Sequence, residues 1–445
     1  MKIVIAGAGD VGFHLARMLS MENHDIILMD VNKEKLAYAE NHLDIMVYKG
    51  NATSPEHLVN AGMENCDLLI AVTSSQSVNI NVAIIGKQLG AKKTVARVSY
   101  MEYVSENSPV DFKSLGIDYM ISPGELAAIE IEKLIDKSAF TESFDFDEGE
   151  LSLVGLNLDG QAPLIDRSIL SLAQLNGELN FMPVAIQRKS EIIIPKGNDY
   201  FRSGDHIYFV ARPEGIEQIM ELCSKKTIEI NNIMILGGSR IGFKTARNLC
   251  NELSIKLIEQ NATKAAELAD DLNNVLVIHG DGTNVELLDE ESIGEMDAFI
   301  AVTGNSETNI MSCLLAKAKG VSKTIALVEN MDYINLSQTI GIDTLINKKL
   351  IAAGDIFRHI RKGNIISVRN LYDTDAEILE FEVTTGTKIT RKPIKQLNFP
   401  KSAIIGGLVR DGKGYITLGD TQIYAGDHVV VFAHPEAIKK VESFF

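Results

Sequence analysis

The first thirty residues alternate apolar runs with a glycine-rich turn and an amphipathic segment. Residues 3–6 form an apolar run, and the turn from Gly7 to Gly12 follows it. Apolar residues between positions 11 and 19 then recur at the spacing of one helix face, and a second apolar run at 26–29 ends in Asp30. This order of strand, glycine turn, helix, strand and acid is that of a nucleotide-binding βαβ unit.

Each glycine has a specific task in such a unit. Gly7 permits the tight turn, Gly9 lets the backbone approach a pyrophosphate, and Gly12 allows the helix to pack closely on the strand. The free N–H groups and the dipole of the helix N-terminus attract phosphates. Asp30 follows Gly12 by 18 residues, close to the position from which an acid accepts hydrogen bonds from a ribose. The alternative is a glycine turn with a purely structural role.

The alternation of strand-like and helix-like segments continues to about residue 121. Further strands are expected at 45–48, 67–72, 94–98 and 120–121, and helices at 32–42, from Ser54-Pro55 onward and at 78–89. Strands that alternate with helices of this length predict a parallel, doubly wound sheet. Pro123 then begins an apolar helix whose apolar positions cover more than one face, so we expect it to bury against something beyond its own sheet.

The pattern changes after this helix. Residues 141–150 form an acidic stretch that we interpret as a connector. Short β-like runs follow at 151–156, 184–187, 191–194 and 206–211, with glycines and Asp/Asn turns between them, and a helix is expected at 213–222. This region therefore predicts a small, β-rich α+β lobe.

The whole pattern restarts at Asn232. An apolar run at 233–236 precedes a second glycine loop, Gly237 to Gly242, 230 positions after the first. The same offset relates Arg17 to Arg247, Gly50 to Gly280, Thr53 to Thr283, Asp67 to Asp297 and Asn79 to Asn309. Asp30 corresponds to Glu259 after a one-residue deletion, and Gly204-Asp205-His206 corresponds to Gly426-Asp427-His428. The chain is therefore predicted to be a tandem duplication.

The predicted fold class is α/β, with two tandem repeats, each a Rossmann-like parallel-sheet domain followed by a small β-rich α+β lobe. The expected bounds are 1–138 and 230–365 for the two sheet domains with the helices that follow them, and 139–225 and 366–445 for the two lobes.

The amino-acid composition and the net charge of the chain argue against several classes of function. With 45% hydrophobic and 23% charged residues, the chain has the composition of an ordinary globular protein. Its formal net charge of -17 argues against binding to nucleic acid or to an anionic membrane surface, because phosphates would be repelled. The four cysteines form no CxxC motif and predict buried, reduced thiols in a cytosolic protein. No apolar run approaches the length of a membrane span, so any membrane role is expected to act through a partner.

The candidate binding residues of the first repeat follow or end predicted strands, at the carboxyl edge of the sheet where ligands bind in such folds. Arg17, on the first helix, is either a phosphate contact or a solvated helix charge. Arg97 ends a buried type of strand, where an unpaired guanidinium would be costly, so we expect it to have a phosphate or carboxylate partner.

The second repeat differs at three positions that bear on binding. Ser239 replaces the middle loop glycine, which lets a pyrophosphate approach less closely, and Arg240 adds positive charge where Asp10 stands in the first loop. Leu327 replaces Arg97, whereas Glu259 can still accept ribose hydrogen bonds. We expect this site to bind a nucleotide, and a structural relic is the alternative.

No catalytic constellation accompanies the loops. A nicotinamide dehydrogenase needs a proton donor or acceptor near the hydride, yet the chain contains no Tyr-x-x-x-Lys and its histidines form no metal-like cluster. His206 and His428 are expected to be packed or surface side chains, and Asp205 and Asp427 to be turn formers. An NAD-dependent oxidoreductase is the main alternative function. A redox-sensing repressor is a weaker one, because it would need a basic recognition helix.

The segments IVIAGAGDVG, LMD, KGNAT, LLIAVTSS, ARV and GDHIYFVA, repeated with variation, resemble the TrkA family, the peripheral subunits of Trk-type potassium uptake systems. The resemblance covers essentially the whole chain as two regulator-of-potassium-conductance (RCK) units. It implies a non-enzymatic regulator that binds NAD(H) and ATP/ADP at the inner face of the cell membrane. It also implies a homotetramer whose eight Rossmann lobes form a ring and dock beneath a potassium-translocating membrane subunit.

The expected sites contain cofactor-binding residues and neither a catalytic nor a metal-binding residue. In the first repeat the expected residues are Gly7, Ala8, Gly9, Asp10, Val11, Gly12, Arg17, Asp30, Asn51, Ala52, Thr73, Ser74 and Arg97. In the second they are Gly237, Gly238, Ser239, Arg240, Ile241, Gly242, Glu259, Asp281 and Thr303. The chain departs from the family at Asn51, where Asp is often found, and at Ser239, where a further glycine is common. Ligand exchange is expected to change the ring geometry and gate potassium flux, with the helix at 124–137 and its counterpart at 350–361 as hinge or interface elements.

Overall fold

The computed structural model describes residues 1–20, 24–103, 108–172, 180–189, 191–226, 228–330, 333, 341–360, 364–370 and 376–445. The chain forms two compact units, Met1–Ala127 with Lys348–Arg361, and Ala128–Asn347 with Lys362–Phe445. This division cuts across the repeats. The helix that follows the second parallel sheet belongs to the first unit, and most of the helix that follows the first sheet belongs to the second unit.

The first unit is built on a six-stranded parallel sheet in the order β3-β2-β1-β4-β5-β6. Its strands are β1 (Lys2–Ala6), β2 (Asp25–Asp30), β3 (Met46–Lys49), β4 (Leu68–Ala71), β5 (Lys93–Arg97) and β6 (Tyr119–Ile121). Its connecting helices are α1 (Asp10–Ser20), α2 (Lys33–His42), α3 (Pro55–Asn60) and α4 (Gln76–Gln88). β4 is buried along its whole length, as is typical where helices cover both faces of a sheet. The strand order reverses between β1 and β4, and ligands bind at such switch points.

Local sequence signals determine where these helices begin. The side chain of Asn32 caps α2 by accepting hydrogen bonds from the N–H groups of Glu34 and Lys35. Ser54 caps α3 in the same way, and Pro55 occupies the first turn of that helix. Both helix starts confirm the sequence prediction.

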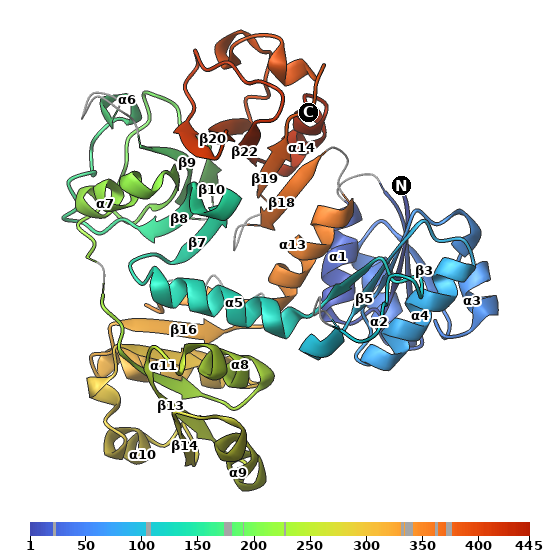
Figure 1. Ribbon diagram of the computed structural model, residues 1–445, viewed down its shortest axis with the longest axis horizontal. Helices are drawn as coiled ribbons and strands as arrows, with labels where there is room; N and C mark the ends of the chain where they lie inside the picture. Colours follow the sequence, from blue (N-terminus) through green and yellow to red (C-terminus); the bar gives the residue numbers. More distant parts are fainter. Residues whose placement is uncertain are drawn as a thin grey trace. The chain divides into compact units, whose positions relative to one another are not determined.

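Helix α13 (Lys348–Ile360) completes the first unit. It lies beside α1 (Figure 1), and Ala352, Ala353, Ile356 and Phe357 on it are fully buried. Near its start, the Lys349 ammonium forms a 2.8 Å ion pair with the carboxylate of Asp10 at the start of α1. The last residue of the helix expected at 350–361 lies outside the described residues.

The second unit contains the second six-stranded parallel sheet, in the order β14-β13-β12-β15-β16-β17. Its strands are β12 (Asn232–Leu236), β13 (Ser254–Glu259), β14 (Val275–His279), β15 (Ala298–Ala301), β16 (Lys323–Leu327) and β17 (Thr344–Ile346). Its connecting helices are α8 (Arg240–Leu249), α9 (Ala262–Asp271), α10 (Val285–Glu290) and α11 (Ser306–Ala318). The sheet order matches that of the first repeat.

Helix α5 (Pro123–Asp136) follows the first parallel sheet, but from Ala128 onward it belongs to the second unit. Glu132 on α5 accepts a 2.5 Å hydrogen bond from the side-chain amide of Asn248 on α8. The buried residues of α5 include Ala128, Ile131 and Leu134. The helix therefore buries against elements beyond its own sheet, as its apolar pattern predicted.

Each parallel sheet is followed by a lobe with a five-stranded, antiparallel sheet, ordered β10-β9-β11-β8-β7 in the first and β18-β19-β22-β20-β21 in the second. The first lobe has β7 (Glu142–Phe146), β8 (Leu151–Asn157), β9 (Phe181–Arg188), β10 (Glu191–Ile193), β11 (His206–Ala211), α6 (Ile169–Leu172) and α7 (Pro213–Leu222). The second has β18 (Ile365–Asn370), β19 (Glu377–Glu382), β20 (Ala403–Arg410), β21 (Lys413–Ile416), β22 (His428–Ala433) and α14 (Pro435–Glu442).

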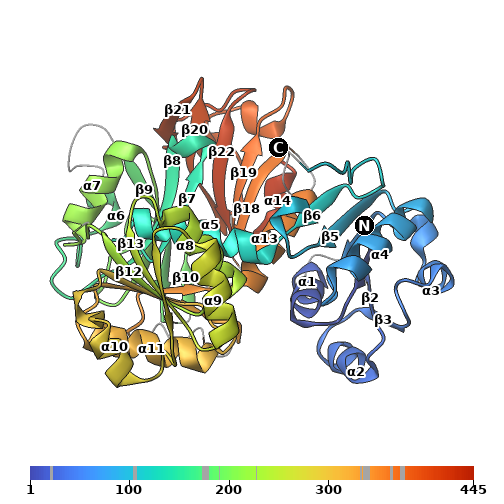
Figure 2. The ribbon, with the colours of Figure 1, turned by 60° about the horizontal axis from the view of Figure 1, so that its bottom comes forward.

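The two lobes share one hydrophobic core, which their sheets enclose (Figure 2). Phe146, Leu151 and Tyr208 from the first lobe pack in it with Ile378 and Phe432 from the second. A Cβ atom at Gly406 would lie 2.7 Å from side-chain carbons of both Val184 and Val210. Glycine at this position therefore permits the close approach of the two sheets.

The interpretation of residues 141–150 as a connector is wrong, because they contain β7, which pairs antiparallel with β8. The acids of β7 are compatible with a strand because each has a partner. Glu142 lies 3.0 Å from His206, and Asp145 pairs with Lys137. No helix in the described part of the chain is long and apolar enough to cross a bilayer.

Candidate nucleotide-binding sites

In both loops, the first and the last glycine are required by the conformation and close packing of the backbone. Gly7 and Gly237 have φ angles of +115° and +104°, which disfavour any side chain. A Cβ atom at Gly12 would lie 1.8 Å from the carbonyl oxygen of Gly7, and one at Gly242 would lie 2.1 Å from that of Gly237. These glycines are therefore needed for the turn and for helix packing, whether or not a ligand binds.

The middle position distinguishes the loops. A Cβ atom at Gly9 would meet no heavy atom within 4 Å, so the protein itself gives no steric reason for a glycine there. In the second loop the hydroxyl of Ser239 donates a 2.7 Å hydrogen bond to the carbonyl of Val302 and caps α8 by accepting one from the N–H of Gly242. The first loop thus leaves open space where the second has a side chain engaged within the protein.

In each repeat, the acid at the end of the second strand accepts hydrogen bonds from a backbone N–H group of the glycine loop and from one just after the strand. Asp30 accepts hydrogen bonds from the N–H groups of Ala8 (2.7 Å) and Asn32 (2.8 Å). Glu259 accepts equivalent bonds from Gly238 (3.0 Å) and Asn261 (2.9 Å). A carboxylate has about four lone-pair positions, so each acid retains capacity for a ribose hydroxyl.

Glu259 has one partner beyond this shared pattern. The Lys264 ammonium on α9 lies 3.0 Å from its carboxylate. Partial burial raises the pKa of Glu259, but the hydrogen bonds from Asn261, Lys264 and Gly238 outweigh burial and lower that pKa overall. Glu259 is therefore a carboxylate at neutral pH.

A matching turn follows the third strand of each sheet. Asn51 accepts hydrogen bonds from the backbone N–H (3.0 Å) and the hydroxyl (2.9 Å) of Thr53. Asp281 accepts the same two bonds from Thr283, at 2.9 and 2.8 Å, and they lower the pKa of Asp281. The two turns therefore have the same geometry and differ in charge, neutral in the first repeat and anionic in the second.

A buried asparagine organises the turn after the fourth strand. The hydroxyl of Thr73 donates a 2.6 Å hydrogen bond to Asn79, whose amide donates a 2.8 Å bond to the carbonyl of Arg97. Thr303, Asn309 and Leu327 form the same chain, with distances of 2.6 and 2.8 Å. The asparagines are at most 1% exposed. The sequence showed them only as landmarks of the repeat.

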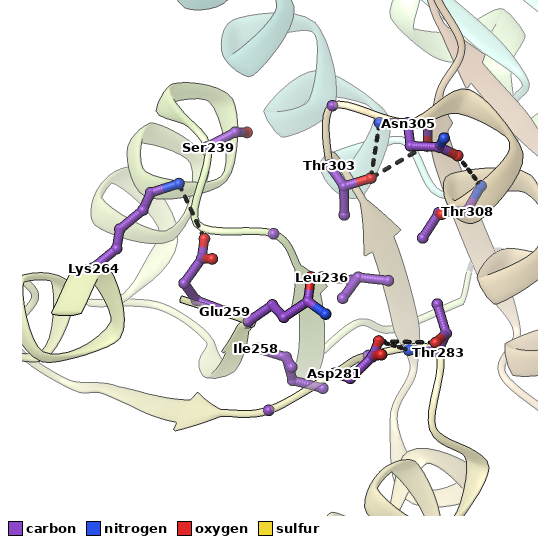
Figure 3. Close-up of a pocket in the computed structure, with 15 residues that line it drawn as sticks. Leu236, Ser239, Ile258, Glu259, Lys264, Asp281, Thr283, Thr303, Asn305 and Thr308 are labelled. Atoms are coloured by element: carbon purple, nitrogen blue, oxygen red, sulfur yellow. Dashed lines mark hydrogen bonds and ion pairs between the residues drawn. The ribbon is translucent and has the colours of Figure 1, made fainter. Parts of the chain in front are cut away.

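The loop, the acid and the two turns of the second repeat line an open cavity of about 480 Å³ (Figure 3). The Glu259–Lys264 pair lies at one side of it, and the turns at Asp281 and Thr303 lie at the other. The volume is within the range of small-molecule sites. The complete lining is Leu236, Gly237, Ser239, Ile258, Glu259, Gln260, Lys264, Gly280, Asp281, Gly282, Thr283, Thr303, Gly304, Asn305 and Thr308.

The cavity brings together five of the residues expected for the second site, Gly237, Ser239, Glu259, Asp281 and Thr303. Gly238, Arg240, Ile241 and Gly242 do not line it. Sequence reasoning missed Lys264 and Thr308. A signal for Lys264 existed, because it stands in the first turn of the helix that follows the acid.

The first-site residues lie at the positions that correspond to those of the second repeat. Arg17 is exposed in the last turn of α1, about 10 Å along the helix axis from its start. Arg97 is partly buried at the end of β5. Ala8, Val11 and Ala52 are buried, and Ser74 is exposed.

Asp205, Asp427 and His206 in the lobes are engaged in contacts within the protein. Asp205 and Asp427 accept backbone hydrogen bonds within their turns, from Arg202 and Tyr424, both at 2.8 Å, which agrees with the prediction of turn formers. Each is also buried against an arginine that the sequence did not reveal. Arg188 and Arg410 each donate two hydrogen bonds to these carboxylates, at 2.6–2.8 Å. His206 is packed, with 7% exposure. No group of metal-binding side chains occurs among the described residues.

Comparison with protein families gives matches over most of the chain. The TrkA-N domain matches residues 3–123 and 233–348, and the TrkA-C domain matches residues 154–224 and 378–445. The Trk system potassium uptake protein TrkA of Azorhizobium caulinodans is 32% identical over 100% of this chain and 98% of its own length. The protein of the same name from Vibrio alginolyticus is 33% identical, with the same coverage.

Solved structures give the same fold at lower identity. The GsuK channel bound to NAD aligns with 100% of this chain and 78% of its own chain, with a TM-score of 0.61 and 15% identity. GsuK bound to ADP aligns with 81% of this chain and 70% of its own, with a TM-score of 0.52 and 15% identity. At this identity the likeness concerns the fold alone.

Proposed function

The chain belongs to the TrkA family, and on that premise we propose that it is the nucleotide-sensing regulatory subunit of a Trk-type potassium uptake system. TrkA proteins are regulatory transport subunits and not enzymes. The full-length relatives named above are potassium uptake proteins. The alignments cover 98% of the length of both relatives, so the proposal concerns the whole chain.

The proposed ligands are NAD(H) and ATP or ADP, bound at the two glycine-loop sites. The observation that carries this proposal is the cavity bounded by Glu259, Asp281 and Thr303, since the first repeat builds the same hydrogen-bonded turns around Asp30, Asn51 and Thr73. GsuK, which shares the fold, has structures with NAD and with ADP. The residues expected from the sequence in each repeat, and the four domain bounds, form part of this proposal.

The proposed partner is the potassium-translocating membrane subunit. The chain would act at the inner face of the cell membrane as a homotetramer with an eight-lobed ring. A nucleotide can favour one arrangement of such a ring only through a difference in its affinity for two states. Exchange of the nucleotide would then change the ring and gate potassium flux in the partner.

Titration of the purified full chain with NADH, NAD, ATP and ADP tests the binding part of the proposal. Asp30→Ala should weaken binding at one site and Glu259→Ala binding at the other, because each variant removes an anionic hydrogen-bond acceptor and leaves the loop N–H without it. We expect each affinity to fall by about tenfold or more. NADH absorbance should stay constant, since a regulator binds the nucleotide without consuming it.

A native mass measurement of the same samples counts subunits and bound nucleotides. Wild-type affinities in both variants, or steady oxidation of NADH by the pure protein, would contradict the proposal.

A further inference from the structure

The two glycine loops carry opposite charges at the first residue of the following helix. α1 begins with Asp10 and α8 begins with Arg240. An acid at a helix N-terminus interacts favourably with the helix dipole, but it repels a phosphate that approaches the same N–H groups. By its own residues, the first loop is therefore less suited to phosphate than the second.

The structure supplies a cation to the first loop from elsewhere in the chain. The ammonium of Lys349 lies 2.8 Å from the Asp10 carboxylate, next to the N-terminus of α1. Lys349 stands in the first turn of α13, which belongs to the same compact unit as this loop. When β6 is aligned with β17, the position of Lys349 corresponds to Gly124 in α5. The first loop thus receives a basic residue from a helix distant in sequence, whereas Arg240 belongs to the helix that directly follows the second loop.

The two side chains of this ion pair differ in their exposure to solvent. The side chain of Lys349 is 13% exposed, whereas that of Asp10 is 75% exposed. A largely buried ammonium must keep an anionic partner, because burying it alone is costly. The exposed carboxylate can leave at little cost. Asp10 is therefore the partner that an incoming anion can replace.

A nucleotide phosphate is suited to that exchange. An ammonium has three donors, and a terminal phosphate offers it several charged oxygens where Asp10 offers two. Gly9, directly before Asp10, faces open space in which a phosphate chain can approach the backbone.

We propose that Lys349 is a phosphate-binding residue of the first site, which α13 contributes to the glycine loop and which exchanges Asp10 for the terminal phosphate of a bound nucleoside diphosphate or triphosphate. This inference rests on the proposed function, because it requires the first loop to bind a nucleotide. It assigns a cation to a loop whose own first helical residue is acidic.

The exchange has a consequence for signalling. α13 follows directly after β17, the last strand of the second parallel sheet, separated from it by Asn347 alone. Occupancy of the first site would then change the ion pair that holds the start of α13 to α1. Through Lys349, α13 would therefore contact the nucleotide of the first repeat, and along the chain it is joined to the last strand of the second parallel sheet.

The test uses the full-length protein with the Glu259→Ala substitution, which weakens the second site so that binding at the first site dominates the titration. ADP binding is measured by calorimetry, and adenosine binding by ligand-observed NMR. The variants added to this background are Lys349→Gln, Lys349→Arg, Asp10→Asn and, as a control with the same change of charge on the same helix, Lys348→Gln.

We expect Lys349→Gln to weaken ADP binding about tenfold or more and to change adenosine binding less than about twofold, because adenosine has no phosphate. Lys349→Arg should keep ADP affinity within about threefold, and Asp10→Asn should tighten ADP binding by removing the competing carboxylate. Lys348→Gln should have little effect on either ligand.

Equal ADP affinities in Lys349→Gln and Lys348→Gln would overturn the role of Lys349 and leave the first site intact. A parallel loss of adenosine binding in Lys349→Gln would also overturn it, because it would reveal a structural defect. Absence of ADP binding in the Glu259→Ala parent itself would contradict the first site, and with it the proposed function of this loop.

Discussion

At the scale of single residues, the glycine loops separate requirements of folding from provisions for a ligand. Gly12 and Gly242 are fixed by contacts with the carbonyl oxygens of Gly7 and Gly237. Gly9 is fixed by nothing within the protein, since a Cβ atom there would meet no neighbour within 4 Å. The absence of a side chain at Gly9 is therefore the more specific sign of a ligand.

Two alanine substitutions in the first loop are therefore expected to affect different properties, one the stability of the protein and the other its affinity for nucleotide. Gly12→Ala should lower the free energy of unfolding by about 1–3 kcal/mol, because its Cβ atom would overlap the carbonyl of Gly7. Gly9→Ala should leave the stability of the protein nearly unchanged and weaken nucleotide binding at the first site by about tenfold, because its Cβ atom would occupy the path of the pyrophosphate. Thermal unfolding and calorimetric titration of both variants measure this. A stable Gly9→Ala variant with wild-type affinity would contradict the assignment.

Residues whose role follows from their position in the motif could be predicted from the sequence. Glu259, Asp281 and Thr303 line the cavity as expected from the ends of their strands. Lys264 was overlooked although its place in the first turn of the helix after Glu259 is a signal, whereas nothing in the sequence around Lys349 indicates Asp10 as its partner. Their significance depends on which acid the fold brings near them.

At the scale of elements, equivalent strands of the two repeats have different surroundings. β5 and β16 both begin with Lys-Thr. Lys93 on β5 is exposed, whereas Lys323 on β16 is 2% exposed and donates a 2.6 Å hydrogen bond to the carbonyl of Phe140. The difference arises because the segment leading into β7 covers the start of β16.

Burial of this strand predicts a specific dependence of stability on pH. Burial lowers the pKa of Lys323 to about 8, against the opposing effects of the carboxylates of Asp343 and Glu142, while Lys317 lowers it further. Between about pH 8 and 10.5 the unfolded chain keeps a proton at this position that the folded chain has lost, so stability rises with pH across that window. Below about pH 8, the contribution is constant.

The comparison of wild type with Lys323→Met isolates this contribution. The free energy of unfolding of the wild type, relative to that of the variant, should rise by roughly 2 kcal/mol between about pH 7.5 and about pH 9.5. Urea titrations at the two pH values measure the difference. Parallel pH profiles for wild type and Lys323→Met would refute the prediction.

Most elements were predictable because local signals define them. Continuous apolar runs gave the central parallel strands, and Asn32, Ser54 and Pro55 marked helix starts. β7 was missed because its acids gave it the composition of a loop. Its strand character depends on His206 and Lys137, partners that lie outside its own sequence.

At the scale of the whole molecule, the duplication could be predicted and the exchange of helices could not. The offset of 230 residues is visible along the chain, and both repeats have the same sheet order. The apolar excess of α5 indicated an additional partner without naming it. Only the fold shows that most of α5 belongs to the second compact unit and α13 to the first. Each parallel sheet therefore shares its unit with a helix of the other repeat.

The duplication has also produced two unequal sites. The first has an open position at Gly9 and a neutral Asn51. The second has a capped loop at Ser239, an anionic Asp281 and the Glu259–Lys264 pair. The two proposed nucleotide sites therefore differ in shape and in charge.

We propose that nucleotide bound at these sites controls potassium uptake. The most direct test measures potassium uptake by vesicles that contain a Trk-type membrane subunit, with the wild-type chain or with the Gly9→Ala, Asp30→Ala double variant added on the cytosolic side, before and after addition of nucleotide. We predict that uptake changes with nucleotide for the wild type and that the double variant has lost most of that response. Equal responses of the two proteins to nucleotide would contradict the account.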